Sequence, residues 1–329
     1  MLLRHASALE NCAVMLSVIN VISDSPKIQK VHLNGNYVVD VLRLDAIHPI
    51  ISGNKWFKLK HNLRRAILEN KKSILTFGGA HSNHLAATAE ACKQAKLLCI
   101  GIVRGDEHTA LSDTLTKAQQ AGMQIEFVNR EKYKQKTETH FIQALHKKYG
   151  DFYLVPEGGS NAEGIIGCIE ILKDIENYDY VLCACGSGAT FAGLVASETQ
   201  NTKIIGISVL KGENKLAQVV SAQLNKMFPQ KNFVILGNEA VNRNYFLSHC
   251  IMNDYAFSGF AKLDLFLIDF KRRFEKQNGV ILDYLYTTKL FYAVEDLLGQ
   301  NKFPEGSKIL VIHSGGLQGN AAFEARYKL

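Results

Sequence analysis

The sequence contains no long hydrophobic run. None of its apolar stretches reaches the roughly 20 residues that a membrane-spanning helix needs, so we expect no membrane contact. The segment 1–15 is moderately apolar, but it carries Arg4, His5 and Glu10 and lacks the core of a signal peptide. We interpret it as an N-terminal extension, 1–14, ahead of a start at Met15.

The sequence also lacks a cysteine spacing that is typical of disulfides or of metal sites. The chain has 7 cysteines without paired spacing. Cys183 and Cys185 would point both thiols to one face of a strand, and a zinc site would need more ligands nearby. We therefore expect no metal site, buried thiols and a reducing compartment, which we take to be the cytoplasm.

The chain has no strong charge of either sign. Lys and Arg number 38 against 31 Asp and Glu, which gives a formal net charge of +7. The basic residues occur in short groups such as Lys71-Lys72 and Lys147-Lys148, without a stripe of interleaved aromatics. This pattern is typical of solvated helix faces and predicts no nucleic-acid partner, while the mild positive charge favours an anionic ligand.

What the chain does contain is an alternation of short apolar runs with longer amphipathic ones. Strands are predicted at 73–77, 97–103, 123–128, 152–156, 180–185, 203–210 and 308–313, and helices at 83–95, 110–121 and 132–149. Alternating strands and helices indicate parallel sheets covered on both faces, and the strands exceed what one small sheet needs. We therefore expect an α/β fold of two three-layer domains, with crossings near 55–60 and at 157–161.

Residues 183–194, CACGSGATFAGL, combine an apolar strand, a loop of small residues and a helix start. Backbone N–H groups at a helix N-terminus bind phosphate, which small residues allow to approach closely. A plain strand-to-helix turn is the simpler alternative. A dinucleotide site is disfavoured because Phe191 replaces the third glycine of G-x-G-x-x-G, and no Walker motif occurs. The predicted contacts of a single phosphate are Gly186, Ser187, Gly188, Ala189 and Thr190.

Two further polar segments follow strands. In FGGAHSNHLAATA, residues 77–89, Ser82 and Asn83 stand where a helix begins, and capping alone would explain them. Their hydroxyl, amide and N–H groups also suit a substrate carboxylate. Ser314 follows the strand 308–313, where α/β sheets bind ligands, but the G-x-S-x-G motif of a serine nucleophile is absent.

The segment SGNKWFKLK, residues 52–60, presents a lysine from a turn. Lys55 directly follows Ser52-Gly53-Asn54, whereas Lys58 and Lys60 can be ordinary surface charges. A positioned amine, a single-phosphate loop, a carboxylate-binding turn and a strand-end hydroxyl together indicate pyridoxal phosphate. The aldehyde of this cofactor binds a lysine amine covalently, so we predict that Lys55 is that amine.

The chain resembles the fold-type II pyridoxal-phosphate enzymes of the D-cysteine desulfhydrase and 1-aminocyclopropane-1-carboxylate (ACC) deaminase family. The segments that carry the resemblance, in the family's order, are GNKWFKL (53–59), GGAHSNH (78–84), VPEGGSN (155–161), GSGAT (186–190), YLYTTK (284–289) and HSGG (313–316). The chain departs from the family's usual residues at Phe57, Ala86 and Thr288.

The resemblance implies two α/β domains of the tryptophan synthase β-like kind, with the cofactor between them. The small domain would span 58–162, and the large one would combine 1–57 with 163–329. Family members are commonly homodimers, and the same assembly is expected here.

The resemblance also implies roles for individual residues. Lys55 would hold the cofactor and then take a proton from the substrate Cα. The other implied contacts are Asn83 to the ring hydroxyl, Ser82 to the substrate carboxylate, the 186–190 loop to the phosphate and Ser314 to the pyridine nitrogen. Tyr255 and Tyr286 would move protons or orient the substrate.

Two positions suggest the substrate. ACC deaminases of the family carry a glutamate at the place of Thr287 and a leucine at that of Ser314, and both places are expected at the reaction centre. We therefore predict β-elimination from a small amino acid, with D-cysteine giving pyruvate, ammonia and sulfide. Deamination of ACC to 2-oxobutanoate is the alternative, followed by a catalytically silent binding protein and, disfavoured by Phe191, a nicotinamide oxidoreductase.

Overall fold

The structure is a computed structural model, which describes residues 26–106, 110–197, 201–212, 215–237, 246, 248–259 and 261–329. The expected extension, 1–14, and Met15 lie outside these residues. Within them, no helix is long and apolar enough to cross a membrane.

The strands form two sheets. The smaller sheet has the order β5-β4-β3-β6, and all of its pairings are parallel. Its strands are β3 (Ser73–Gly79), β4 (Leu98–Arg104), β5 (Met123–Val128) and β6 (Tyr153–Val155). The larger sheet has the order β1-β2-β10-β7-β8-β9. Its strands are β1 (Ile28–His32), β2 (Val38–Arg43), β7 (Tyr180–Cys185), β8 (Lys203–Ser208), β9 (Cys250–Met252) and β10 (Ile309–His313).

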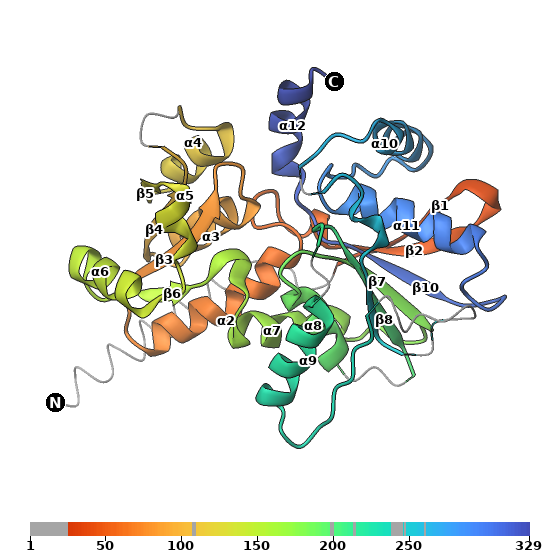
Figure 1. Ribbon diagram of the computed structural model, residues 1–329, viewed down its shortest axis with the longest axis horizontal. Coiled ribbons are helices and arrows are strands. Elements are labelled where there is room, and N and C mark those ends of the chain that lie inside the picture. The colour runs from red at the N-terminus through yellow and green to blue at the C-terminus, as the bar shows by residue number, and fades with distance from the viewer. Residues whose placement is uncertain are drawn as a thin grey trace.

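Helices separate and cover the two sheets (Figure 1). In that view the smaller sheet lies on the left with α3 (Asn83–Gln94), α4 (Asp113–Gln120), α5 (Arg130–Lys134) and α6 (Thr139–Tyr149). Between the sheets lie α2 (Asn54–Leu68), α7 (Ala162–Ile169) and α8 (Ala189–Ala196). The remaining helices belong with the larger sheet: α9 (Leu216–Met227), α10 (Leu265–Asn278), α11 (Thr287–Gly299) and α12 (Asn320–Tyr327).

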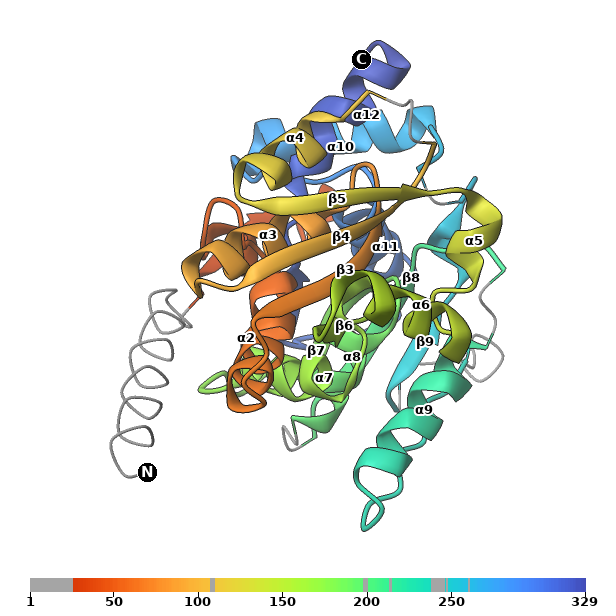
Figure 2. The same cartoon turned by 90° about the vertical axis from the view of Figure 1, so that its left-hand side faces the viewer.

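Alternation along the buried strands divides each sheet into two packed faces. In β3, Ile74 joins the core formed with α2 and α3, while Leu75 and Phe77 pack with Tyr133 and Phe141 of α5 and α6. Successive side chains point to opposite faces of a strand, so the near-continuous apolar runs are those of strands buried on both sides. Figure 2 shows the smaller sheet from its outer side, with its strands running side by side.

Side-chain caps start several of these helices. Ser82 begins α3, Ser112 α4, Asn129 α5 and Asn161 α7, each by accepting a backbone N–H three residues ahead. Such caps satisfy donors that the first helical turn leaves without partners.

The predicted two-sheet α/β architecture is confirmed, although several individual elements differ from the prediction. The antiparallel pair β1–β2 and the short β9 were not predicted. The helix expected at 132–149 is two helices, α5 and α6, because the chain turns at 135–138. The domain boundaries, 58–162 against 1–57 and 163–329, stay a prediction.

Candidate active site

One large cavity, about 790 Å³, lies between the two sheets. Its walls come from the carboxyl ends of strands in both sheets and from the first turns of α2, α3 and α8. Ligands of open α/β sheets bind at this end of the strands. Of the predicted site residues, those that line the cavity are Lys55, Asn83, Gly186, Ser187, Gly188, Thr190, Tyr286 and Ser314.

Lys55 is brought into the cavity by a tight turn at Gly53. Gly53 has φ 68° and ψ −152°, a conformation open to glycine, and a Cβ there would lie 1.8 Å from the carbonyl oxygen of Ser314. The next residue, Asn54, donates its backbone N–H to that same oxygen at 3.3 Å. The first turn of α2 is thereby fixed against the end of β10, which places Lys55 beside Ser314 in the cavity wall.

The Lys55 amine is prepared to react near neutral pH. Burial, and to a smaller extent the charge of Lys58, lowers the pKa of Lys55 to about 7, while Cys168 and Asp283 oppose this shift. Its Nζ donates to Oδ1 of Asn54 at 3.1 Å, which restricts the direction of the amine. A large fraction of the amine is therefore neutral, and so nucleophilic, under conditions where an ordinary lysine is almost wholly charged.

Lys58 is a functional candidate that the sequence reasoning missed. Its side chain is 3% exposed, so it is not a surface charge. Its Nζ donates to the carbonyl oxygen of Gly158 at 3.1 Å, and burial lowers its pKa. Lysines are rarely this buried without a partner or a role, and Lys58 lines the cavity next to the lysine whose pKa it lowers.

The loop between β7 and α8 forms a cradle of small residues. Gly188 has φ 83°, and a Cβ there would meet Val220 at 2.7 Å. A Cβ on Gly186 would lie 3.2 Å from the ring of Tyr286. Thr190 is tied to the lysine-bearing helix, because Asn54 Nδ2 donates to its Oγ1 at 2.7 Å. The backbone N–H groups that start α8 therefore face a cavity wall that a phosphate can approach.

Asn83 supplies an acceptor that no described residue satisfies. Its Nδ2 donates to the carbonyl oxygen of Gly316 at 3.2 Å, but its buried Oδ1 has no hydrogen-bond partner. A buried acceptor without a partner costs about 1–3 kcal/mol, so a ligand donor is expected there. The ring hydroxyl of pyridoxal phosphate is such a donor. With Lys55 for the aldehyde and 186–190 for the phosphate, the residues fit this cofactor.

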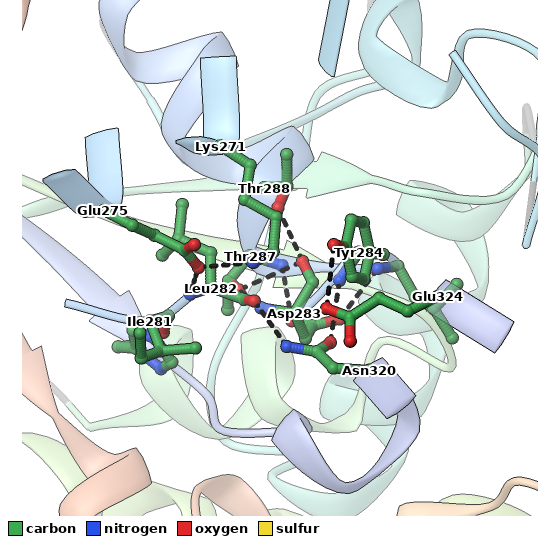
Figure 3. A network of polar contacts seen from close by, with 12 residues as sticks. Lys271, Glu275, Ile281, Leu282, Asp283, Tyr284, Thr287, Thr288, Asn320 and Glu324 are labelled. Atoms are coloured by element: carbon green, nitrogen blue, oxygen red, sulfur yellow. Dashed lines mark hydrogen bonds and ion pairs between the residues drawn. The ribbon is translucent and has the colours of Figure 1, made fainter. Parts of the chain in front are cut away.

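The buried carboxylate of Asp283, labelled in Figure 3, accepts hydrogen bonds from the turn that holds Tyr286 at the cavity. Asp283 is 1% exposed and accepts the backbone N–H groups of Leu285, Tyr286 and Thr287 at 2.9, 2.8 and 2.8 Å. Its Oδ2 also accepts the hydroxyl of Thr287 at 2.7 Å. Burial raises the pKa of Tyr286, with smaller contributions from Asp283 and Glu157, so its hydroxyl keeps its proton at neutral pH.

Outer contacts fix the strand-like segment that leads to Asp283. Asn320 Nδ2 donates to the carbonyl oxygen of Leu282 at 2.8 Å, and the Leu282 N–H donates to Glu275 at 2.7 Å. Tyr284 donates its hydroxyl to Glu324 at 3.0 Å. As Figure 3 shows, α10, α11 and α12 all contribute to this network, so the position of Tyr286 depends on the packing of three helices.

Three predicted site residues do not line the cavity. Ser82 is the N-cap of α3, and its Oγ accepts the N–H of Leu85 at 3.4 Å. Ala189 is buried at the start of α8, behind the loop. Tyr255 is 6% exposed, and its hydroxyl donates to Asp296 at 2.8 Å, so it holds the turn η6 (Asp254–Ala256) against α11. The structure thus places this tyrosine in the core, and the role expected for it from the loose match of 254–259 to an active-site loop stays a prediction.

Thr287, expected at the reaction centre, is also absent from the cavity wall. It is 0% exposed and is engaged by Asp283. Among the residues that the structure describes, no group of three His, Cys, Asp or Glu side chains is placed to hold a metal ion.

The fold is shared with fold-type II pyridoxal-phosphate enzymes. A crystal structure described as an ACC deaminase homologue superimposes with a TM-score of 0.75 at 24% identity, covering 95% of this chain and 97% of that one. A pyridoxal 5'-phosphate-dependent aspartate racemase superimposes with a TM-score of 0.63 at 13% identity, covering 94% and 95%. At these identities the likeness concerns the fold alone.

Comparison of the sequence shows the family to which the chain belongs. The family model described as "Pyridoxal-phosphate dependent enzyme" matches residues 31–315, and the chain belongs to that family. A protein of Pyrococcus furiosus with a provisional name of ACC deaminase is 29% identical over 82% of this chain and 82% of its own length. A bifunctional mitochondrial D-cysteine desulfhydrase/ACC deaminase of Arabidopsis thaliana is 28% identical over 82% of this chain and 70% of its own length. The predicted cofactor, pyridoxal phosphate, and the predicted enzyme class are confirmed.

Proposed function

We propose that the chain catalyses β-elimination from a small amino acid, with D-cysteine as the substrate and pyruvate, ammonia and sulfide as the products. The observation that carries the proposal is Lys55, whose amine has its pKa lowered to about 7 and lies in one cavity with the 186–190 loop and the unsatisfied Oδ1 of Asn83. A near-neutral amine can bind an aldehyde and can also take a proton from carbon.

Each residue of the candidate site has a proposed role. Bound pyridoxal phosphate supplies an electron sink for the pair left when the substrate Cα–H bond breaks. Lys55 holds the cofactor in the resting enzyme and, once released by the substrate amine, accepts the Cα proton at Nζ. The 186–190 loop binds the phosphate and Asn83 the ring hydroxyl. Tyr286, which keeps its proton, orients the substrate or donates to the leaving group. Ser82, at the start of α3, binds the substrate carboxylate only after a shift of its side chain.

Ser314 decides between the two candidate reactions. Ser314 lines the cavity, and its hydroxyl is proposed to face the pyridine nitrogen. A neutral hydroxyl there makes a weaker electron sink than a carboxylate would. Expulsion of thiolate from Cβ tolerates a weak sink, whereas opening a cyclopropane ring expels carbon and needs strong electron withdrawal. Thr287 does not help to choose between β-elimination and ACC deamination, because it lies behind the cavity wall.

Deamination of ACC is the second candidate. The names of the relatives favour it, because several carry a provisional ACC deaminase name and the Arabidopsis relative is named for both activities. A catalytically silent binding protein is the third candidate, which a Lys55 able to bind the cofactor disfavours.

The test is a substrate panel assayed for keto acid and for sulfide. Purified protein is incubated with D- and L-cysteine, chloroalanine, D-serine and ACC, and Lys55→Ala serves as the control. Sulfide and pyruvate from D-cysteine, lost in Lys55→Ala, are expected. Turnover of ACC without turnover of D-cysteine would establish the second candidate, and no turnover at all would leave the third.

Assembly and location complete the proposal. We propose a homodimer in the cytoplasm, with the small domain at 58–162 closing over the cofactor. The six described cysteines, all free and buried, fit a reducing compartment. Size-exclusion chromatography with light scattering measures the mass of the assembly, and a monomer would contradict this part of the proposal.

A further inference from the structure

The smaller sheet brings two cations to the cavity that the proposed reaction does not use. Arg104 ends β4, and Lys136 lies in the connection between α5 and α6. Both line the same cavity as Lys55, on the side made by the smaller sheet and its helices. Neither is needed to hold a cofactor whose phosphate is cradled by the 186–190 loop of the larger sheet.

A buried aromatic ring positions the two cations. The Arg104 guanidinium lies 5.7 Å from the centroid of the Tyr133 ring, and the Lys136 ammonium lies 5.0 Å from it. Tyr133 is 3% exposed and packs edge-on against Phe77 at 6.2 Å. A ring fixed in the core holds both charges by cation–π contact, so they are less free than solvated side chains.

The cations outnumber the local carboxylates. Lys136 pairs with Glu157 at 3.4 Å, and Glu157 also lines the cavity. Within the residues that the structure describes, no carboxylate lies within ion-pair distance of Arg104. Its Nη2 instead lies 3.7 Å from a Cβ built on Gly79, the last residue of β3. Arg104 therefore reaches across the end of the neighbouring strand, with no ion-pair partner in the part of the chain that the structure describes.

Apolar side chains line the wall beside these cations. Phe77, Ile142 and Leu154 line the cavity together with Arg104 and Lys136. A free cysteine has nothing to place against such a wall. An apolar wall next to the Arg104 guanidinium, with Lys136 and its partner Glu157 nearby, suits a short methylene or thioether chain that ends in an anion.

We propose that the preferred substrate carries a second anionic group beyond Cβ, a carboxylate or a group of similar charge, and that Arg104 binds it with help from Lys136. This rests on the proposed β-elimination and deepens it. The Cα–H proton goes to Lys55, the Cβ–S bond breaks, and the anionic thiolate leaves with the electron pair. Water then converts the three-carbon remainder to pyruvate and ammonia.

The test compares two substrates that differ in one charge. S-carboxymethylcysteine and S-carbamoylmethylcysteine have the same shape, and only the first has a distal carboxylate; each is assayed as the D and the L form. We expect a kcat/KM at least about 5-fold higher for the carboxylate, because charge-assisted hydrogen bonds exceed what solvent screening removes. The preference is expected to shrink as salt is added.

Variants assign the preference to Arg104. Arg104→Gln is expected to raise KM for the carboxymethyl substrate to that of the carbamoylmethyl one with kcat unchanged, and Arg104→Lys to keep part of the preference. Arg64→Gln, an equal loss of charge on the exposed face of α2, is the control and keeps the preference. Equal kcat/KM for the two substrates in the unaltered enzyme would overturn the proposal.

A binding measurement separates this inference from the elimination itself. Glutarate and glutaramate lack an amine, so the holoenzyme does not consume them, and calorimetry gives their affinities. Glutarate bound about 5-fold tighter, with the difference lost in Arg104→Gln, would support the anion site even if no cysteine derivative is turned over. Equal affinities would reject the anion site even if D-cysteine is a substrate.

Discussion

The carboxylate of Asp283 accepts a hydrogen bond from the hydroxyl of Thr287 at 2.7 Å, and the two side chains are 1% and 0% exposed. The same carboxylate accepts three backbone N–H groups of the turn that carries Tyr286. Thr287 therefore acts on the cavity through the turn and not by contact. A glutamate here, as in ACC deaminases, would require a different partner from Asp283, because two buried carboxylates at this spacing repel.

Replacing Thr287 tests this network. Thr287→Val keeps the shape but removes one donor to a buried carboxylate, so we expect the free energy of unfolding to fall by about 1–3 kcal/mol. Thr287→Glu should cost more, because it buries a second carboxylate beside Asp283. Urea unfolding of the protein measures both. Thr116→Val, on the half-buried face of α4, is the matched control and should change stability by less than about 0.5 kcal/mol.

A Thr287→Glu protein as stable as the unaltered one would contradict the structural role of Thr287. It would return position 287 to the set of substrate markers, and the choice between D-cysteine and ACC would then have to weigh it again.

The elements that could be predicted from the sequence are the ones with local signals. The strand predicted at 123–128 and that at 180–185 coincide with β5 and β7, because both are short apolar runs bounded by turn residues. The β1–β2 pair was missed although Asn34-Gly35, a strong hairpin signal, separates its strands. These two strands are partly exposed, and their apolar and polar residues alternate only weakly, so the sequence does not show the apolar run that is typical of a buried strand.

The residues of the candidate site also divide into those with a local signal in the sequence and those without one. Lys55 and the 186–190 loop were predictable, since glycines beside reactive groups leave a local signature. The sequence also holds a local signal for Lys58, because its immediate neighbours Trp56, Phe57 and Leu59 are large apolar residues, which favour a buried stretch of helix. Arg104 and Asp283 could not be found locally, because their roles depend on neighbours brought together by the fold.

Gly53→Ala tests the turn that presents Lys55. A Cβ at this position would lie 1.8 Å from the Ser314 carbonyl oxygen, and the backbone conformation is one that alanine avoids. We expect a loss of more than about 3 kcal/mol in the free energy of unfolding, or no folded protein. Gly299→Ala, where a Cβ meets nothing within 4 Å, is the control and should be neutral or slightly stabilising. A stable Gly53→Ala protein that still binds cofactor would show that the turn has freedom the structure does not indicate.

Ser314→Ala tests the contact proposed for the pyridine nitrogen. The change leaves the backbone carbonyl that anchors Asn54 in place, so the fold should be unaffected. Loss of one hydrogen bond should weaken cofactor binding by about 3- to 10-fold, measured by titration of apoprotein with pyridoxal phosphate. Ser307→Ala, remote from the cavity, should bind the cofactor as the unaltered protein does. Unchanged affinity and unchanged kinetics in Ser314→Ala would remove Ser314 from the proposed site.

The lowered pKa of Lys55 predicts a pH dependence of cofactor attachment. Only the neutral amine reacts with an aldehyde, and its fraction rises with pH through the folded-state pKa of about 7. At saturating pyridoxal phosphate, the attachment rate should rise to a midpoint near pH 7 and level off above about pH 8, whereas an ordinary lysine would gain about 10-fold per pH unit up to pH 9. Visible absorbance and borohydride trapping at Lys55 measure the rate.

The lowered pKa of Lys55 should also make the stability of the apoprotein depend on pH. Between about pH 7 and the ordinary lysine value of 10.5, the unfolded chain binds more protons at Lys55 than the folded chain does. The contribution of this residue to the free energy of unfolding therefore increases as pH rises through that window and is constant below it. Lys55→Met should remove this slope, and a slope that survives the substitution must come from other groups.

Burial and the charge of Lys58 both lower the pKa of Lys55, and a Lys58→Met variant separates these two causes. Removing the neighbouring charge should move the midpoint of attachment to higher pH, but it should stay well below 10.5, because burial is the larger cause. Lys60→Met removes an equal charge from the same helix, where the lysine pairs with Glu170, and should leave the midpoint in place. If Lys58→Met leaves the midpoint near 7, the charge of Lys58 is not felt at Lys55 and burial alone sets its reactivity. If both variants move it equally, the effect is one of net charge and not of the contact between the two lysines.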